Sequence, residues 1–326
     1  MEIICSSRIQ RYPQRCLTLF DTKGFDDKTV EKIYRICDIL QKISLAEYTK
    51  ERLSLYGGTS LNFLHFKNIP RLSMDIDFNF RDLKTEDWGK ERDEIDKIIK
   101  KILSDLKYSN QDIKIQADYP ITRFTVNYKT KDDQPDSIKI EIGYMRRIPI
   151  FKNDIISKFN HFKTNEEIEL KTPISEELFG NKFCTLLYRY RDEKVISSRD
   201  LFDVYTISKN NFDSEMFETA LVIDSLMRPE PRIYKRNPKT ILDNVLIDNQ
   251  LLNLIRSGEI PKDLKQKSQD FVNKYISISK EKYQEIIDTF FDKHEFNPKL
   301  LKNYAILNSD IKSHPSILWN LKQLKK

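Results

Sequence analysis

The spacing of hydrophobic residues changes once along this chain, near residue 165, and that change constrains the fold more than any other feature. Before it, four short runs alternate apolar and polar residues with the period of two that is typical of half-buried strands: 75–80, 112–117, 122–128 and 137–142. After it, apolar residues recur at helical spacing in segments 175–191, 200–209, 213–227, 241–256, 264–294 and 298–308. The sequence therefore predicts an α/β (α+β) domain with a small mixed sheet at residues 1–165 and an α-helical domain at residues 166–326.

The first domain also contains helices. Helical spacing over 27–43, with Asp26 or Asp27 placed to cap its start, predicts an amphipathic helix. A second, charged helix is expected over 85–106. Between them, the short apolar run 53–56 predicts a strand that leads through a double glycine into helical spacing at 59–66.

Composition excludes several classes of protein. Hydrophobic residues make up 39% of the 326 residues, which suits a packed core and excludes collagen-like and wholly disordered chains. No apolar stretch approaches the ~20 residues of a membrane helix, and the N-terminus lacks the pattern of a secretory signal, so we expect a cytoplasmic protein that does not enter membranes. The four cysteines (Cys5, Cys16, Cys37, Cys184) are scattered and far from the histidines, which argues against zinc and disulfides.

Basic residues slightly outnumber acidic ones, by 56 Lys+Arg to 50 Asp+Glu, for a formal net charge of +6. Clusters at 234–239, 262–267 and 322–326 suit a polyanionic partner. A lysine-rich, solvated surface explains each cluster taken alone equally well, so charge by itself decides nothing.

Gly57 and Gly58 form a pair in a chain that has only seven glycines. Between a strand and a helix, such a pair lets backbone approach a ligand and aims free N–H groups and the positive end of the helix at an anion, most often a phosphate. A simple tight turn accounts for most such pairs, so this feature gains weight only together with others.

Asp75 and Asp77 lie on the same face of the strand expected at 75–80, because their positions differ by two. Two adjacent carboxylates suit a divalent cation, although a solvated edge strand is the simpler explanation of a lone pair. Glu141 lies on the polar face of the strand expected at 137–142, and it completes a carboxylate triad if the two strands are neighbours. Three acidic groups around paired Mg²⁺, with a glycine turn for a triphosphate, are what phosphoryl or nucleotidyl transfer requires.

Lys182 falls within the apolar stripe of the helix expected from residue 175. Its ammonium either snorkels to the surface or reaches into the cleft toward a triphosphate. Further along, Asp200 and Asp203 lie three residues apart on one helical face, where a surface or capping role is the simpler alternative.

Two blocks of this sequence resemble a known family. Residues 57–61 read Gly-Gly-Thr-Ser-Leu and residues 71–78 read Arg-Leu-Ser-Met-Asp-Ile-Asp-Phe. Both match in full the GGT-x-L and R-x-S-x-D-I-D-F blocks of the AbiEii/AbiGii-type nucleotidyltransferase toxins. Residues 176–182 and 199–203 resemble looser blocks of that family, so the resemblance covers about residues 53–207 and leaves the helical C-terminal third unmatched.

The resemblance implies a DNA polymerase β-like nucleotidyltransferase core and an α-helical C-terminal domain in the toxin of a type IV toxin–antitoxin or abortive-infection system. It places Mg²⁺ on Asp75 and Asp77, with Lys182 at the nucleotide and Asp200 completing the site. Glu141 stands at the third acidic position and would act as a further ligand or as a base. The triphosphate would be held by Gly57, Gly58 and Thr59.

Arg71 and Ser73 match the family block and are grouped here with the nucleotide-binding residues, although Arg71 could brace the loop instead of contacting phosphate. The family is associated with NTP-dependent modification of RNA, and tRNA 3′ ends are the acceptor proposed for several members. The implied partners are therefore an NTP, an RNA and a cognate antitoxin. Two alternatives stay open: a catalytically silent nucleotide- or RNA-binding module, and transfer of NMP to a protein hydroxyl.

Overall fold

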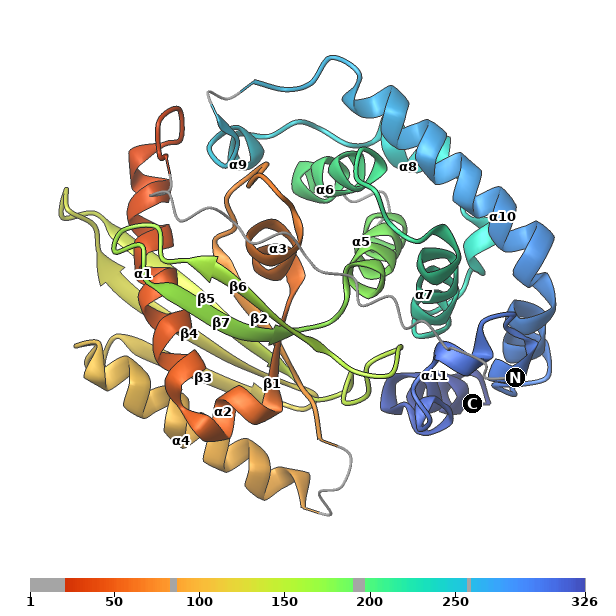
Figure 1. Ribbon diagram of the computed structural model, residues 1–326, viewed down its shortest axis with the longest axis horizontal. Coiled ribbons are helices and arrows are strands. Elements are labelled where there is room, and N and C mark those ends of the chain that lie inside the picture. The colour runs from red at the N-terminus through yellow and green to blue at the C-terminus, as the bar shows by residue number, and fades with distance from the viewer. Residues whose placement is uncertain (1–20, 83–86, 190–196, 257–258, 326) are drawn as a thin grey trace, which may run out of the picture.

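The computed structural model describes residues 21–82, 87–189, 197–256 and 259–325, so Cys5, Cys16 and the N-terminus considered above lie outside the described residues. Its centre is a five-stranded sheet in the order β1-β2-β5-β4-β3 (Figure 1). The strands are β1 (Leu53–Tyr56), β2 (Asp75–Phe80), β3 (Ile113–Asp118), β4 (Ile121–Lys129) and β5 (Pro135–Gly143). Only β2 and β5 pair in parallel, and the other neighbours are antiparallel, which confirms the predicted small mixed sheet.

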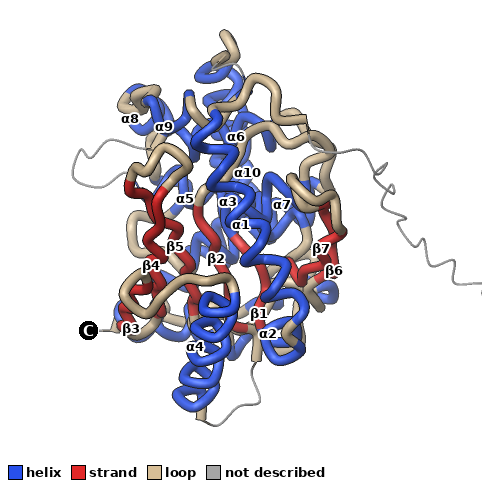
Figure 2. Tube along the Cα trace, turned by 90° about the vertical axis from the view of Figure 1, so that its left-hand side faces the viewer, coloured by secondary structure: helices blue, strands red, loops and turns tan. Residues whose placement is uncertain are grey.

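Three helices cover one face of this sheet. They are α1 (Asp27–Leu45), α2 (Glu47–Arg52) and α4 (Trp88–Asp105), and Figure 2 shows α1 and α4 in front of the strands. Asp26 caps α1 as expected, because its side chain accepts the N–H of Thr29 at 2.9 Å. The alternating apolar residues of β2 and β5 point toward these helices and form a first core with them.

A two-stranded hairpin, β6 (Ile155–Asn160) and β7 (Glu167–Thr172), follows the sheet and was not predicted. The domain division expected at residue 165 falls inside the connection between its strands. Ile168 and Leu170 of β7 are buried in the first core, and the helices of the C-terminal region begin with α5 at Ser175. The change of architecture in the structure therefore follows Thr172.

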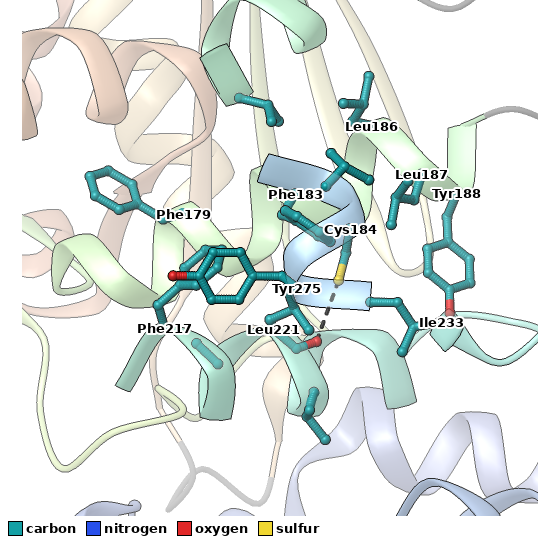
Figure 3. Packing of buried hydrophobic residues seen from close by; sticks show 14 of the residues in the cluster. Phe179, Phe183, Cys184, Leu186, Leu187, Tyr188, Phe217, Leu221, Ile233 and Tyr275 are labelled. Atoms are coloured by element: carbon teal, nitrogen blue, oxygen red, sulfur yellow. Dashed lines mark hydrogen bonds between the residues drawn. The ribbon is translucent and has the colours of Figure 1, made fainter. Parts of the chain in front are cut away.

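The remainder is helical: α5 (Ser175–Arg189), α6 (Ser198–Ser208), α7 (Ser214–Leu226), α8 (Pro238–Asp243), α9 (Asn249–Leu252), α10 (Leu264–Asp292) and α11 (Pro315–Leu324). Phe183 of α5 packs edge-on against Phe217 of α7 with ring centroids 5.9 Å apart, and Tyr275 of α10 closes on Phe217 at 4.7 Å (Figure 3). The long α10 therefore packs along the outer side of the helical region and contributes side chains to the second core (Figure 1). Within the described part of the chain, no helix is both long enough and apolar enough to cross a membrane.

Two predicted helices are wrong in detail. The segment 241–256 contains α8 and α9 instead of one helix, because Asp248 caps a new start by accepting the N–H of Leu251. The segment 298–308 forms two 3₁₀ turns, Pro298–Leu300 and Tyr304–Ile306, in place of an α-helix. Helix α11 was not predicted.

The helical region returns to the sheet region after α9. The backbone N–H of Leu72 donates to the carbonyl of Leu254 at 2.8 Å, and Arg71 and Ile255 form an isolated β-bridge. Leu254 is fully buried in the first core, which otherwise consists of residues before 171. The two regions are thus interlocked at the loop that carries the Arg71 block.

Candidate active site

The turn after β1 brings backbone against the acidic strand. Gly57 has φ +67°, and a Cβ placed on it would lie 2.0 Å from Oδ2 of Asp77. Only glycine fits there, because the backbone is left-handed and a carboxylate fills the space of a side chain. The helix expected at 59–66 is present, but it begins at Gly57 as α3 (Gly57–Ser60) and continues as a π-helical turn over Leu61–His65. Its first N–H groups have no intrahelical partner and are free to face a ligand.

Three side chains of the matching blocks are buried, and for Arg71 the contacts favour the alternative left open above, a brace of the loop. Thr59 is fully buried and its hydroxyl donates to the carbonyl of Asp75, so only its backbone can face a phosphate. Ser73 is buried behind the turn, with its Oγ 2.8 Å from the position of a Cβ on Gly58. Arg71 is 3% exposed and forms two 2.7 Å bonds to Asp203, so it braces the loop and does not reach the cleft.

Asp75 and Asp77 lie on β2 opposite the face that carries Ile76 and Phe78, as expected. Burial first, and then the negative charge of Asp75, raise the pKa of Asp77 to about 6, although Lys182 opposes the shift. The carboxylate of Asp75 has Arg199 as its nearest cation among the described residues, with Nη1 3.6 Å from Oδ2. Two neighbouring carboxylates that repel each other fit a divalent cation, which would remove the repulsion.

Glu141 lies beside the pair, because the parallel register of β2 and β5 places it level with Asp77. Its carboxylate is bound by Arg123, at 2.6 Å from Nε. Among the residues that the structure describes, no three His, Cys, Asp or Glu side chains gather as a metal site. The expected triad is thus an aspartate pair with Glu141 next to it in an ion pair.

Lys182 is buried in α5 and held by two acids of α6. Its Nζ lies 2.9 Å from Asp203 Oδ2 and 3.7 Å from Asp200 Oδ1. Burial alone would raise the pKa of Asp203, but Arg71 and then Lys182 lower it to about 2, so this carboxylate stays ionised. Asp200 is 3% exposed and also binds Arg189 at 2.6 Å.

Asp203 is a site residue that the sequence analysis left as a surface or capping group. It holds both Arg71 and Lys182 and therefore connects the loop before β2 to α5. Its spacing from Asp200, three residues along one helical face, was the signal that could have identified it.

A cleft of about 320 Å³ joins these elements. Gly57, Asp77 and Glu141 line it from the sheet side, and Lys182 and Arg189 line it from α5. Its charge is therefore divided between carboxylates on one wall and cations on the other, which suits a metal-bound polyphosphate.

Arg146 and Arg228 extend the cationic wall, and the sequence analysis missed both. They bind the same buried carboxylate, Asp224, at 2.6 and 2.9 Å. Asn181 donates to that carboxylate at 3.0 Å. Burial would raise the pKa of Asp224, but Arg146 and then Arg228 lower it to about 2. An acid within the apolar run of α7 was the available signal.

Comparison with known proteins gives a family match and a likeness in fold. The family described as "Nucleotidyl transferase AbiEii toxin, Type IV TA system" matches residues 38–295, which is more than half of the chain. No curated protein matches the sequence of this chain. Among solved structures, the nucleotidyltransferase toxin MenT4 (Rv2826c) of Mycobacterium tuberculosis H37Rv is similar in fold, with a TM-score of 0.54 and 13% identity over 92% of this chain and 95% of that one. An antigenic nucleotidyltransferase-like protein of Paracoccidioides brasiliensis gives a TM-score of 0.34 at 11% identity, covering 70% of this chain and 97% of that one.

Proposed function

Because this chain belongs to the AbiEii family of nucleotidyl transferase toxins of type IV toxin–antitoxin systems, we propose that it transfers NMP from an NTP to an RNA, with a tRNA 3′ end as acceptor and Mg²⁺ as cofactor. That it is a nucleotidyltransferase follows from the family. The donor, the acceptor, the metal and a cognate antitoxin as its partner are the proposal. The observation that carries it is a single cleft lined by Asp77, Gly57 and Lys182.

Asp75 and Asp77 would hold the Mg²⁺. The metal would neutralise phosphate charge and polarise the phosphorus under attack. Two observations support this assignment: the raised pKa of Asp77 and the absence of a closer cation than Arg199 beside Asp75 among the described residues.

Three groups of the chain would position the donor. The backbone at Gly57 lets the triphosphate approach the first turn of α3, where N–H groups are free. Lys182, fixed by Asp200 and Asp203, places its ammonium in the cleft without having to be ordered during the reaction. Arg146 and Arg228 would accommodate the charge of the departing pyrophosphate.

In the proposed reaction, the 3′-hydroxyl oxygen of the RNA forms a bond to the α-phosphorus and the α–β phosphoanhydride bond breaks. Pyrophosphate leaves with the electron pair of that bond. The hydroxyl proton passes to Glu141, which lines the cleft level with Asp77. Catalysis rests on positioning and on charge stabilisation, as is usual for phosphoryl transfer.

The test incubates the full chain with each α-³²P-NTP, Mg²⁺ and total cellular RNA and resolves the products on a denaturing gel. We expect label on a discrete RNA band. The Asp75→Asn/Asp77→Asn variant should lose at least about a thousandfold in rate, because a metal ligand that contributes ~4 kcal/mol is removed. Asp132→Asn, in the exposed turn before β5, makes the same chemical change away from the cleft and should leave the rate unchanged.

Two results would contradict the proposal. Label on protein instead of RNA would show transfer to a protein hydroxyl. No label on either, together with salt-dependent binding of NTP or RNA, would show a silent binding module.

A further inference from the structure

A second cluster of interest lies at the edge of the cleft and consists of Trp88, Tyr119, Ile121 and Arg147, here called the rim patch. The rings of Trp88 and Tyr119 have centroids 4.9 Å apart, at an interplanar angle of 51°. Arg147 lies over the Trp88 ring, with Cζ 5.6 Å from its centroid. Aromatic rings and an arginine are therefore collected at one place from α4, from β4 and its preceding turn, and from the loop after β5.

The rim patch adjoins the cleft at two points. Ile121 lines the cleft with Glu141, and it follows Tyr119 by two residues. Arg146 also lines the cleft, and it directly precedes Arg147. The two segments are fixed to each other, because the N–H of Tyr144 donates to the carbonyl of Pro120 at 2.9 Å.

The apolar part of the rim patch is open to solvent. Tyr119 is 54% exposed and Ile121 is 38% exposed, although most large apolar side chains of the described residues are buried. An exposed tyrosine packed on a half-buried tryptophan beside an active-site cleft is unfavourable for a chain with no partner at that place.

Arg147 is the cation of the rim patch that is available to a ligand. Its Nε donates to the carbonyl of Tyr144 at 2.9 Å, which fixes its direction. Across the described ranges no carboxylate lies within 4.0 Å of Arg147, whereas Arg92, which also lies near the Trp88 ring, is paired with Asp93 at 3.2 Å. A fixed arginine that has no acidic partner among the described residues is well suited to a phosphate.

We propose that the rim patch binds the single-stranded 3′ end of the acceptor RNA: bases stack on Tyr119 and Trp88, and Arg147 binds a backbone phosphate. This inference rests on the proposed function, because it assigns a place to the acceptor of that reaction. Stacking on aromatic side chains is how proteins hold unpaired bases, and it tolerates any sequence.

The same rings could in principle stack the base of the donor NTP, but the position of Arg147 favours the acceptor. All the phosphates of an NTP are needed inside the cleft, at Asp77, the glycine turn and Lys182. A further phosphate site outside the cleft therefore has nothing to bind on a mononucleotide. A polynucleotide carries a phosphate at every residue, so its strand can occupy the rings and the arginine together.

The test measures binding and needs no turnover, so it stands apart from the test of the transfer reaction. A short fluorescein-labelled single-stranded RNA is titrated with the full chain, and its anisotropy is followed at low and raised salt. Tyr119→Ala and Arg147→Gln should each weaken binding about tenfold, since a base stack or a phosphate contact is lost. Arg147→Gln should also lower the dependence of binding on salt, whereas Tyr119→Ala should not.

Three controls keep the result specific. Tyr119→Phe retains the ring and should bind like the wild type. Tyr304→Ala removes a partly exposed tyrosine in the C-terminal region, and Lys101→Gln removes one positive charge from the exposed side of α4. Neither of these two substitutions should change RNA binding. No test or control variant should change the affinity for a fluorescent NTP analogue.

Several outcomes would overturn the inference. One is RNA binding by Tyr119→Ala and Arg147→Gln as tight as by Tyr304→Ala and Lys101→Gln. Another is a loss of NTP affinity in Tyr119→Ala, which would assign the rings to the donor base. Duplex RNA that binds as tightly as the single strand would exclude stacking of unpaired bases. If transfer itself fails but the variants lose RNA binding as described, the proposed function falls and the assignment of this surface to single-stranded RNA remains.

Discussion

Asp203 shows how much of the cleft depends on single side chains that never touch a substrate. It binds Arg71 in the loop before β2 and Lys182 in α5, and it is fully buried. Buried ion pairs of this kind add little net stability, but they fix geometry, because an unpaired partner would be costly. The consequence is a lysine whose position in the cleft is set before any nucleotide binds.

Gly57→Ala should lower the free energy of unfolding by about 1–3 kcal/mol and abolish transfer. The residue has φ +67°, and the new Cβ would overlap the carboxylate of Asp77, so the strain falls on the proposed metal ligand itself. Urea unfolding and the labelling assay measure the two effects.

The matched control is Gly89→Ala in the first turn of α4, where a Cβ meets nothing closer than 3.3 Å and alanine is favourable in a helix. Wild-type activity in Gly57→Ala would mean that the backbone at this turn does not approach the phosphates.

The affinity for Mg²⁺ should depend on the ionisation of Asp77. Because the pKa of this group is raised to about 6, the carboxylate gains a proton as the pH falls through that value, and the metal must displace it. We expect the affinity, measured by calorimetry, to fall about tenfold per pH unit below about pH 6 and to be nearly constant above about pH 7.

Asp77→Asn should remove both the tight binding and its pH dependence. An affinity that is the same at about pH 5 and about pH 7 would show that Asp77 does not hold the metal.

For single residues, the sequence identified candidate site residues, but it did not always show which way their side chains point. Alternation along β2 placed Asp75 and Asp77 on one face, because the period of a strand allows no other arrangement. Thr59 lies on a helical turn, where a shift of one residue rotates a side chain by about 100°. A motif match therefore could not show that its hydroxyl faces Asp75 instead of a ligand.

The packing of α5 against α7 fixes the cationic wall of the cleft. Gly180 lies at their crossing, and a Cβ there would come within 2.8 Å of the backbone N of Leu221. Lys182 and Asn181 follow directly on α5, and Asp224 lies on α7, so the crossing distance sets where these groups stand.

Gly180→Ala should therefore push the two helices apart. Backbone atoms cannot swing away as a side-chain end can, so we expect a loss of about 1–3 kcal/mol in unfolding free energy. Activity should fall mainly through kcat, because Lys182 is displaced from the position that serves the transition state. Urea unfolding and steady-state kinetics separate the two effects.

Gly89→Ala again provides the comparison, since it adds the same methyl group to a helix where only a side-chain oxygen, Oδ1 of Asp87, lies near, at 3.3 Å. Unchanged stability and kcat in Gly180→Ala would show that the crossing tolerates a wider spacing.

Secondary structure was predictable where apolar periodicity was strong, as in β2, β4, β5 and α10. The hairpin of β6 and β7 was missed because only Phe159 of β6 is buried, and apolar and polar residues alternate only weakly along that strand. The break between α8 and α9 was missed because periodicity continues across it while Asp248 starts a new helix. Capping and tertiary contacts decide such cases, and a single sequence shows them only weakly.

The two hydrophobic cores are linked by more than one segment. Leu254, from the helical half, is buried in the first core, and Leu61 and Phe66, from the sheet half, are buried in the second. Each core therefore loses packing if the other unfolds, and we expect one cooperative transition for the described parts of the chain.

The two tryptophans can test this expectation, because Trp88 lies in α4 and Trp319 lies in α11. Trp319→Phe leaves only Trp88 as a fluorescent reporter, and Trp88→Phe leaves only Trp319. In urea, the two variants should show coincident midpoints and equal m-values, and both should agree with far-ultraviolet circular dichroism of the wild type.

Each single variant must first match the wild-type midpoint by circular dichroism, which controls for the substitution itself. A separation of the two fluorescence midpoints would show that the halves unfold independently.

The pairing of Arg71 and Leu72 with Ile255 and Leu254 has a consequence for the order in which a ribosome makes this chain. The glycine turn and both aspartates are made early, but Lys182, Asp203 and the strand partner of Arg71 are made much later. Until then Arg71 has neither its carboxylate nor its backbone partner, so the loop that leads into β2 and its two aspartates lacks these contacts. We therefore expect a chain that ends before Ile255 to give no product in the labelling assay.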